Sequence, residues 1–136
     1  MDVEEARTFV RENHRAVLHT YRRDGSPQLS PVSVAVDDDG YTTVSSRETA
    51  MKVKNLRRDP RAALCVLNDK FYGDWVFIEG ECAIVQLPEA MEMLVAYYRS
   101  ISGEHPDWDD YRAAMERDKR VMLRISFDRV GPSVSG

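Results

Sequence analysis

The chain has 136 residues, a size that suits one domain with its own hydrophobic core and is too short for a second full-sized one. Hydrophobic residues make up 43% and charged residues 31%, as in globular proteins, which excludes a disordered or membrane-spanning chain. The net charge of −4 and the absence of a signal-like N-terminus favour a cytoplasmic protein that binds neither nucleic acid nor membranes.

The N-terminal part is typical of a short helix followed by antiparallel strands. Asp2 is a suitable N-cap, and hydrophobic residues recur after it at helical spacing. The residues Asp24-Gly25-Ser26-Pro27 predict a hairpin turn. Pro31 cannot donate a ladder hydrogen bond, so its strand is predicted to lie at an edge or to contain a bulge or kink. The predicted elements are a helix over 2–13 and strands over 16–21, 28–36 and 41–45.

The remaining part alternates between helical and extended patterns. A short basic helix is predicted to end at Asp59-Pro60. Gly80 lies inside an apolar run, which indicates a bulge or a close approach of another backbone segment. Hydrophobic residues at three- and four-residue spacing then predict two helices, and an alternating pattern predicts a last strand. The predicted elements are helices over 49–58, 88–102 and 106–117, and strands over 62–67, 75–85 and 121–127.

About six short strands, mostly consecutive and joined by hairpins, stand against three or four helices. This order favours an antiparallel barrel with helices on its outside and ends. A doubly wound sheet would require strands that alternate with helices and usually a glycine-rich phosphate turn, and the sequence has no GxGxxG or P-loop motif. We therefore expect a single domain over residues 1–136.

The segment from Ser45 to Arg61 is the strongest candidate for a binding site. A strand end rich in hydroxyl groups leads into a helix whose first turn offers unpaired backbone N–H groups, with Lys52 near that turn. This arrangement suits a phosphate or another anion. The alternative is that the basic residues only coat a solvated helix face, but the neighbouring Ser45, Ser46 and Thr49 favour binding.

No set of nucleophile, base and orienting group can be identified in the sequence, so no catalytic residue is predicted. The three histidines, His14, His19 and His105, are scattered, and we expect surface or structural roles for them. Cys65 and Cys82 lack partners at metal-ligand spacing. We expect both to be buried free thiols and predict no metal site.

Several segments follow one another in a specific order along nearly the whole chain. They are the hairpin turn before Gln28–Val32, the strand end Ser45-Ser46, the basic helix from Lys52 to Arg61, the strand Trp75–Gly80, the stretch Tyr98–Trp108 and the closing strand at Arg120-Val121. In this order the chain resembles the pyridoxamine-phosphate-oxidase-like split barrels, and within them the reductases that use the deazaflavin coenzyme F420. The resemblance implies a mainly β (α+β) fold: a six-stranded antiparallel split β-barrel of Greek-key topology with flanking helices.

The resemblance also implies a homodimer with a cofactor site at the subunit interface. By matching motifs, the backbone of the segment Gln28 to Val32 would pass beside the tricyclic ring, and Ser45, Ser46 and Lys52 would hold the phosphate end. Tyr72 would either stack on the cofactor or be a lone exposed loop aromatic. The implied cofactor-binding residues are Gln28, Leu29, Ser30, Pro31, Val32, Ser45, Ser46, Arg47, Met51, Lys52 and Tyr72.

One departure from the pattern concerns the phosphate. Relatives commonly carry an arginine two residues before the lysine, where this chain has Ala50. The phosphate clamp is therefore expected to be weaker unless Arg47 or Lys54 reaches the site.

The implied activity is that of an F420-dependent reductase, which transfers a hydride from reduced F420 to a small electron-poor organic substrate. An FMN-binding oxidase or reductase of the same fold is a second hypothesis, and a non-catalytic cofactor-binding or carrier protein is a third. Because the deazaflavin has a longer and more anionic tail than FMN, the additional charges of Lys54, Arg57 and Arg58 favour F420.

Overall fold

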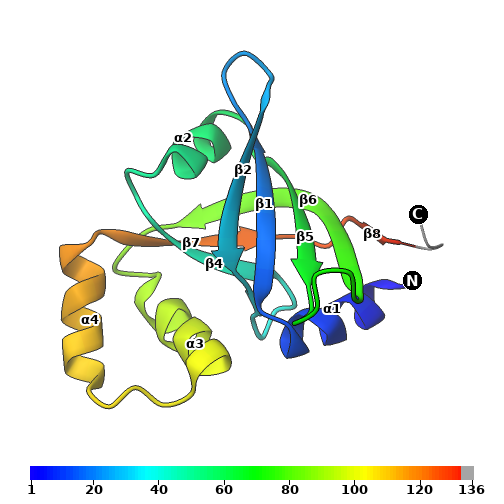
Figure 1. Ribbon diagram of the computed structural model, residues 1–136. Helices are drawn as coiled ribbons and strands as arrows, with labels where there is room; N and C mark the ends of the chain where they lie inside the picture. The colour runs from blue at the N-terminus through cyan, green and yellow to red at the C-terminus, as the bar shows by residue number, and fades with distance from the viewer. Residues whose placement is uncertain (133–136) are drawn as a thin grey trace.

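The structure is a computed structural model, and it describes residues 1–132. One curled sheet forms most of the molecule, and the helices lie at its ends and edges (Figure 1). The helices are α1 (Val3–Glu12), α2 (Met51–Arg58), α3 (Met91–Ser102) and α4 (Trp108–Arg117). The strands are β1 (Arg15–Tyr21), β2 (Pro27–Ser33), β3 (Ala35–Val36), β4 (Thr42–Arg47), β5 (Arg61–Leu67), β6 (Trp75–Val85), β7 (Arg120–Ile125) and β8 (Arg129–Gly131).

The strands pair in the order β2-β1-β5-β6-β7-β4-β3, with β8 beside β6, and every pairing is antiparallel. Strand β6 makes the sheet curl, because its first seven residues pair with β5 and its last four with β7. The curve of this long strand is visible in Figure 1. The predicted antiparallel split barrel is therefore confirmed.

Alternation of side chains along the strands builds the barrel core. In β1, for example, Ala16, Leu18 and Thr20 point inward and are at most 5% exposed. Helix α1 adds Ala6 and Val10 to this core, and α2 adds Val53 and Leu56. A second, smaller core lies between α3, α4 and the outer face of β7, centred on Leu94, Tyr111 and Met122.

The predicted elements differ from the observed ones mainly in short pieces. Eight strands are present where six were expected, because the predicted strand 28–36 is divided into β2 and the two-residue β3, and the three-residue β8 is too short for a periodic pattern. Asp2 caps α1 as predicted, since its carboxylate accepts the N–H of Glu5 at 2.8 Å. Helix α3 begins at Met91 and not at Pro88, because a turn precedes it.

The strand with Pro31 lies at the end of the sheet, as expected for a proline. In residues 1–132 no helix is long and apolar enough to cross a membrane. Both cysteines are free; Cys82 is buried, whereas Cys65 is only half-buried.

A pH-dependent loss of stability is expected from the smaller core. The hydroxyl of Tyr111 donates to the carbonyl of Leu94 at 2.8 Å, and burial raises the pKa of Tyr111 to about 12. The unfolded chain releases this proton near the ordinary tyrosine pKa of about 10. The stability contribution is thus complete below about pH 10 and is lost as the pH rises towards 12.

Urea unfolding at about pH 8 and about pH 11 measures this loss. Tyr111→Phe, which has no phenolic proton, should lose less stability between the two pH values than the wild type. An equal loss in both proteins would show that the ionisation of Tyr111 does not contribute.

Candidate functional site

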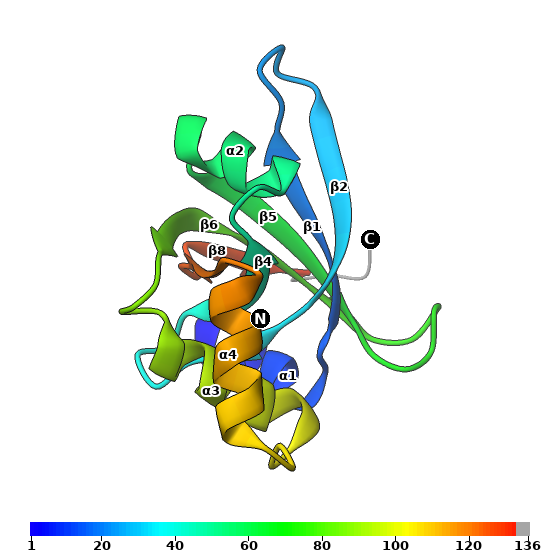
Figure 2. The ribbon, with the colours of Figure 1, turned by 90° about the vertical axis from the view of Figure 1, so that its left-hand side faces the viewer.

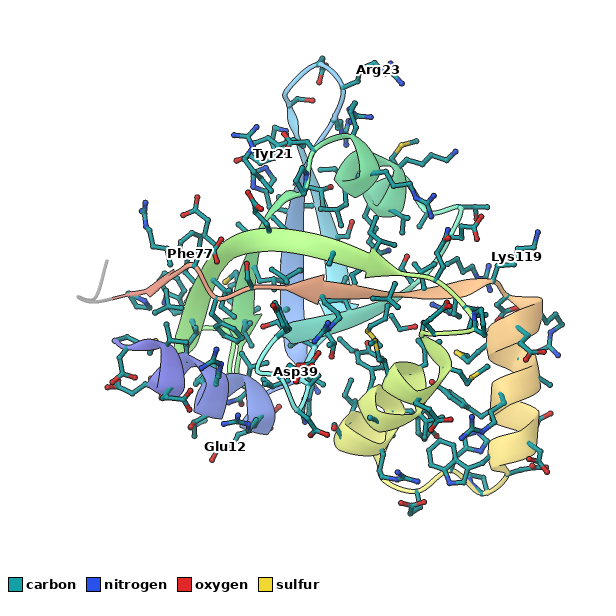
Figure 3. All side chains as sticks on the ribbon, turned by 180° about the vertical axis from the view of Figure 1, so that it is seen from behind. Glu12, Tyr21, Arg23, Asp39, Phe77 and Lys119 are labelled. Carbon is teal, nitrogen blue, oxygen red and sulfur yellow. The ribbon has the colours of Figure 1, made fainter. Side chains whose placement is uncertain are left out.

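Helix α2 lies beside the end of the β1–β2 hairpin (Figure 2). Val53 and Leu56 anchor it because both are buried in the barrel core. The loop before the helix is fixed as well, since the N–H of Glu48 donates to the carbonyl of Lys119 at 3.0 Å. This bond joins the start of α2 to the junction of α4 and β7, which Lys119 marks in Figure 3.

The N-terminus of α2 is open to an anion. Ala50 precedes the helix and provides no side-chain cap, and the first turn contains no acidic residue. The first N–H groups of a helix have no partner within it, so they carry a partial positive charge. Lys52 lies in this turn and is half-buried. The electrostatics of this helix end therefore favour the predicted anion site.

Two more cations approach from the sheet. Arg47 at the end of β4 is the register partner of Arg120 at the start of β7. Met122 faces the α3–α4 core, so by strand alternation Arg120 and Arg47 share this outer face. In residues 1–132, Arg47, Lys52 and Arg120 make no ion pair with a carboxylate. We call these three residues the cation cluster.

Like charges within the cation cluster oppose one another. Burial lowers the pKa of Lys52, and the positive charge of Arg120 lowers it further. Arg120 also has a buried Nε with no hydrogen-bond partner in the described chain. A bound anion would offset both costs, because it pairs with the charges and accepts hydrogen bonds.

A groove of 550 Å³ lies on the other side of α2, between the helix and the β1–β2 hairpin. Four of its seven lining residues are cations, and Arg23 lies at the hairpin tip in Figure 3. None of the four forms an ion pair within residues 1–132. The lining residues are Arg22, Arg23, Gln28, Met51, Lys54, Asn55 and Arg58.

Asn55 holds this groove together. Its amide Nδ2 donates to Thr20 Oγ1 at 3.1 Å and to Gln28 Oε1 at 3.3 Å. Its Oδ1 accepts from Arg58 at 3.0 Å, and Arg58 also donates to the carbonyl of Tyr21. Asn55 is 1% exposed and its bond to Thr20 is buried, whereas its bonds to Gln28 and Arg58 are partly buried. One buried amide thus fixes α2 against both strands of the hairpin.

Asn55→Ala is expected to destabilise the protein by about 1 to 3 kcal/mol, because it leaves the buried hydroxyl of Thr20 without its donor. It should also weaken ligand binding in the groove, since Gln28 and Arg58 lose their common anchor. Chemical unfolding and ligand titration measure the two effects. Gln86→Ala removes an exposed side-chain amide between β6 and α3 and serves as the control; an equal effect of both changes would contradict this role of Asn55.

The structure brings most of the predicted site residues to one region. Gln28 and Met51 line the groove, and Leu29, on the edge strand, is 65% exposed. Ser45 lies on the outer face of β4 with Arg47, opposite Met122. Ser46 differs, because it is 2% exposed and its hydroxyl donates to the carbonyl of Arg47. The remaining residues of the predicted edge segment, Ser30, Pro31 and Val32, also lie in β2.

Tyr72 lies apart from the other predicted residues. Its loop joins β5 to β6 beside Arg15 at the start of β1, whereas α2 lies at the other end of that strand (Figure 2). Tyr72 is 97% exposed and contacts Phe71 edge to face. Within one chain, Tyr72 therefore does not join the cation cluster or the groove.

Sequence reasoning missed Arg120, Arg22 and Arg23 as members of this region. The two hairpin arginines precede a recognised turn, so the hairpin prediction together with a basic helix nearby was a usable signal. Arg120 is different, because only the pairing of β4 with β7 places it beside Arg47, and the two residues are far apart in sequence.

A second hollow, of 270 Å³, lies between α3 and the β3–β4 turn. Its cation is already paired, since Arg124 bonds to Asp37 at 2.8 Å and to Asp39 at 3.0 Å. None of the predicted site residues lines it. The region around α2 is thus the better candidate site.

Known proteins are similar to this chain in sequence and in fold. The chain is 25% identical over 127 residues to the F420H(2)-dependent biliverdin reductase of Mycobacterium tuberculosis (strain CDC 1551 / Oshkosh), covering 93% of this chain and 85% of the relative. The crystal structure of the conserved hypothetical protein Rv2991 of M. tuberculosis superposes with a TM-score of 0.79 at 29% identity, covering 100% of this chain and 93% of the other.

The fold also occurs in proteins with other roles. HutZ, the heme storage protein of Vibrio cholerae, has a TM-score of 0.72 at 16% identity, with 96% of this chain and 94% of HutZ covered. The sequence profile that describes pyridoxamine 5′-phosphate oxidase matches residues 3–132, nearly the whole chain. The resemblance found in the sequence is confirmed, and the chain belongs to the pyridoxamine 5′-phosphate oxidase family.

Proposed function

We propose that this protein is a cytoplasmic F420-dependent reductase that transfers a hydride from reduced F420 to a small electron-poor organic substrate. The observation that carries the proposal is the pair of unneutralised cationic regions around α2, in a chain whose net charge is −4. The relative at 25% identity, an F420H(2)-dependent biliverdin reductase, supports the same cofactor.

The edge of β2 is suited to a planar ring. The N–H of Val34 donates to the backbone carbonyl of His14, just before β1. Because backbone groups alternate in direction along an antiparallel strand, the even-numbered residues of β2 point their N–H and C=O groups towards β1. The N–H and C=O of Leu29 and the C=O of Pro31 then face the free edge. Main-chain donors and acceptors on a fixed strand can orient a ring, and the deazaflavin when bound supplies the hydride itself.

The phosphate end would lie at Lys52, Ser45 and Arg47, next to the N-terminus of α2. The groove supports the choice of F420 over FMN. FMN ends at its phosphate, whereas the F420 tail carries additional carboxylates, for which Arg22, Arg23, Lys54 and Arg58 offer partners. These four cations would have no ligand to pair with in an FMN protein.

The decisive experiment is purification from a host that lacks F420. We expect a colourless protein that binds added F420 in a fluorescence titration and, with reduced F420, reduces one or more members of a panel of enones, quinones and tetrapyrroles that includes biliverdin. A yellow protein that retains FMN would establish the FMN hypothesis instead. Tight F420 binding without turnover on any substrate would indicate a carrier.

We further propose that two copies of the chain form a homodimer through the outer face of the sheet. Pro31, Val17, Cys65 and Phe77 form one cross-strand row on this face, pointing away from the barrel core. Leu29 and Trp75 extend the apolar surface on either side of this row and are 65% and 40% exposed. A contiguous apolar sheet face of this kind suits a protein partner.

Val17→Arg, at the centre of this row, should convert the dimer to a monomer without loss of secondary structure, because the arginine would be buried without a partner in the interface. Sedimentation equilibrium and circular dichroism measure these outcomes. Thr8→Arg on the exposed face of α1 is the control. A wild type that is monomeric at micromolar concentration, or a Val17→Arg variant that stays dimeric, would refute this interface.

The dimer would also give Tyr72 a role. Since Tyr72 lies at the end of the sheet opposite α2, it can contribute to a cofactor site only as a residue of the second copy. A loss of F420 affinity in Tyr72→Ala would support such a contribution.

A further inference from the structure

We propose that Arg120 is a ligand of the cofactor phosphate and, together with Lys52, forms the clamp that Ala50 cannot provide. This inference rests on the proposed function, because it assigns a residue to the phosphate end of that cofactor. The inference goes beyond the proposed function, since Arg120 belongs to β7, whereas the phosphate ligands were expected only at the end of β4 and in α2.

The position of Arg120 is set by the sheet. Val121 and Leu123 point into the barrel core, and Met122 packs against α3 and α4. Arg120 is on the same face as Met122, directly across from Arg47 and one pair away from Ser45. The backbone bond from Glu48 to Lys119 then holds this strand end against the loop that leads into α2. Arg120 and the N-terminus of α2 thus belong to one rigid corner.

The surroundings of Arg120 leave its charge unsatisfied. Its Nε is buried and has no hydrogen-bond partner in residues 1–132, and no described carboxylate lies within 4.0 Å of its guanidinium. By contrast, Arg124 lies on the same face of β7 and contacts two aspartates. A buried unpaired guanidinium nitrogen is costly, and a phosphate oxygen is its natural acceptor.

The charge of Arg120 acts on Lys52. The two cations repel each other, which contributes to the lowered pKa of Lys52. The hydroxyls of Tyr97 and Tyr111 are also within the field of Arg120, and both are committed to backbone carbonyls, of Ser33 and Leu94. No carboxylate of residues 1–132 therefore neutralises Arg120 and Lys52, whereas a phosphate between them would.

The test compares Arg120→Gln with Arg117→Gln. The second variant removes the same charge from an exposed position at the end of α4, three residues before Arg120. Dissociation constants are measured by fluorescence titration for F420, FMN and riboflavin, the last of which has no phosphate. Arg120→Gln should weaken F420 and FMN binding at least tenfold and leave riboflavin binding within about twofold. Arg120→Lys should retain most of the affinity, and Arg117→Gln should resemble the wild type.

Ala50→Arg provides a rescue variant. Introduced together with Arg120→Gln, it should restore a large part of the lost affinity if both side chains serve the same phosphate. Circular dichroism and melting temperature show whether Arg120→Gln folds; if it does not, the comparison of Arg120→Lys with the wild type in F420 and FMN titrations replaces it, with a loss below tenfold expected.

The outcomes separate the two proposals. If the wild type binds F420 or FMN and folded Arg120→Gln binds it with the same affinity, the role of Arg120 is overturned and the cofactor assignment stays in place. An equal loss for riboflavin would also overturn it, because the effect would then not involve the phosphate. A wild type that binds none of the three ligands would overturn both proposals.

Discussion

Gly80→Ala is expected to destabilise the protein by about 3 kcal/mol, at the upper end of the usual cost of overpacking. A Cβ at Gly80 would lie 1.8 Å from the carbonyl oxygen of Ser126 and 2.8 Å from its carbonyl carbon. These atoms belong to the backbone, so no side-chain rotation relieves the clash. Moving them apart would strain the bonds that join Ser126 to Glu81, at 3.0 and 3.1 Å.

Chemical unfolding of the two proteins measures this difference. Gly25→Ala is the matched control, because nothing lies within 4 Å of the Cβ and only the positive φ of 85° opposes alanine there. That strain costs about 1 to 2 kcal/mol. If Gly80→Ala is no more destabilising than Gly25→Ala, the close approach of Ser126 to Gly80 at the bend of β6 is wrong.

Lys52→Ala should weaken F420 binding by about 1 to 3 kcal/mol, which is roughly a 5- to 150-fold rise in the dissociation constant. The ammonium is half-buried beside an uncapped helix N-terminus and has no carboxylate partner in the described chain. Its removal also relieves repulsion with Arg120, so the ligand-free protein should melt no lower than the wild type.

Fluorescence titration and thermal melting check the two expectations for Lys52. Lys70→Ala removes a lysine from the exposed β5–β6 loop and should leave the affinity unchanged, apart from any effect of that loop on a second copy. Unaltered F420 affinity in Lys52→Ala would remove Lys52 from the site. A marked drop in the melting temperature would show that Lys52 is structural.

The fold could be predicted largely from the sequence because its signals are local. Asp24–Pro27 specified the first hairpin, Pro31 indicated an edge strand, and Asp59-Pro60 marked the end of α2. The predicted strand 28–36 was not divided into β2 and β3, and β8 was missed, since two or three residues carry no periodicity. Gly80 predicted a close approach but not its partner, because Ser126 is 46 residues away.

The candidate site was predictable only in part. Lys52 and Ser45 lie near each other in the sequence, so a strand followed by a basic helix was sufficient to propose an anion site there. The role of Asn55 could not be predicted, because its bonds to Thr20 and Gln28 depend on how α2 packs on the hairpin. The position of Arg120 depends on the register of β4 and β7, for which no local pattern exists.

The free edge of β2 has a consequence for the solubility of the protein. An open strand edge can recruit a strand from another molecule, and such recruitment needs an unbroken series of amide donors, as in amyloid growth. Four residues of β2 point their backbone groups towards the free edge, and two of them, Pro27 and Pro31, have no amide hydrogen. The carbonyl of Ser33 is occupied by Tyr97 at 2.8 Å. The two prolines therefore prevent a strand of another molecule from pairing along this edge, while the remaining backbone groups can still bind a small molecule.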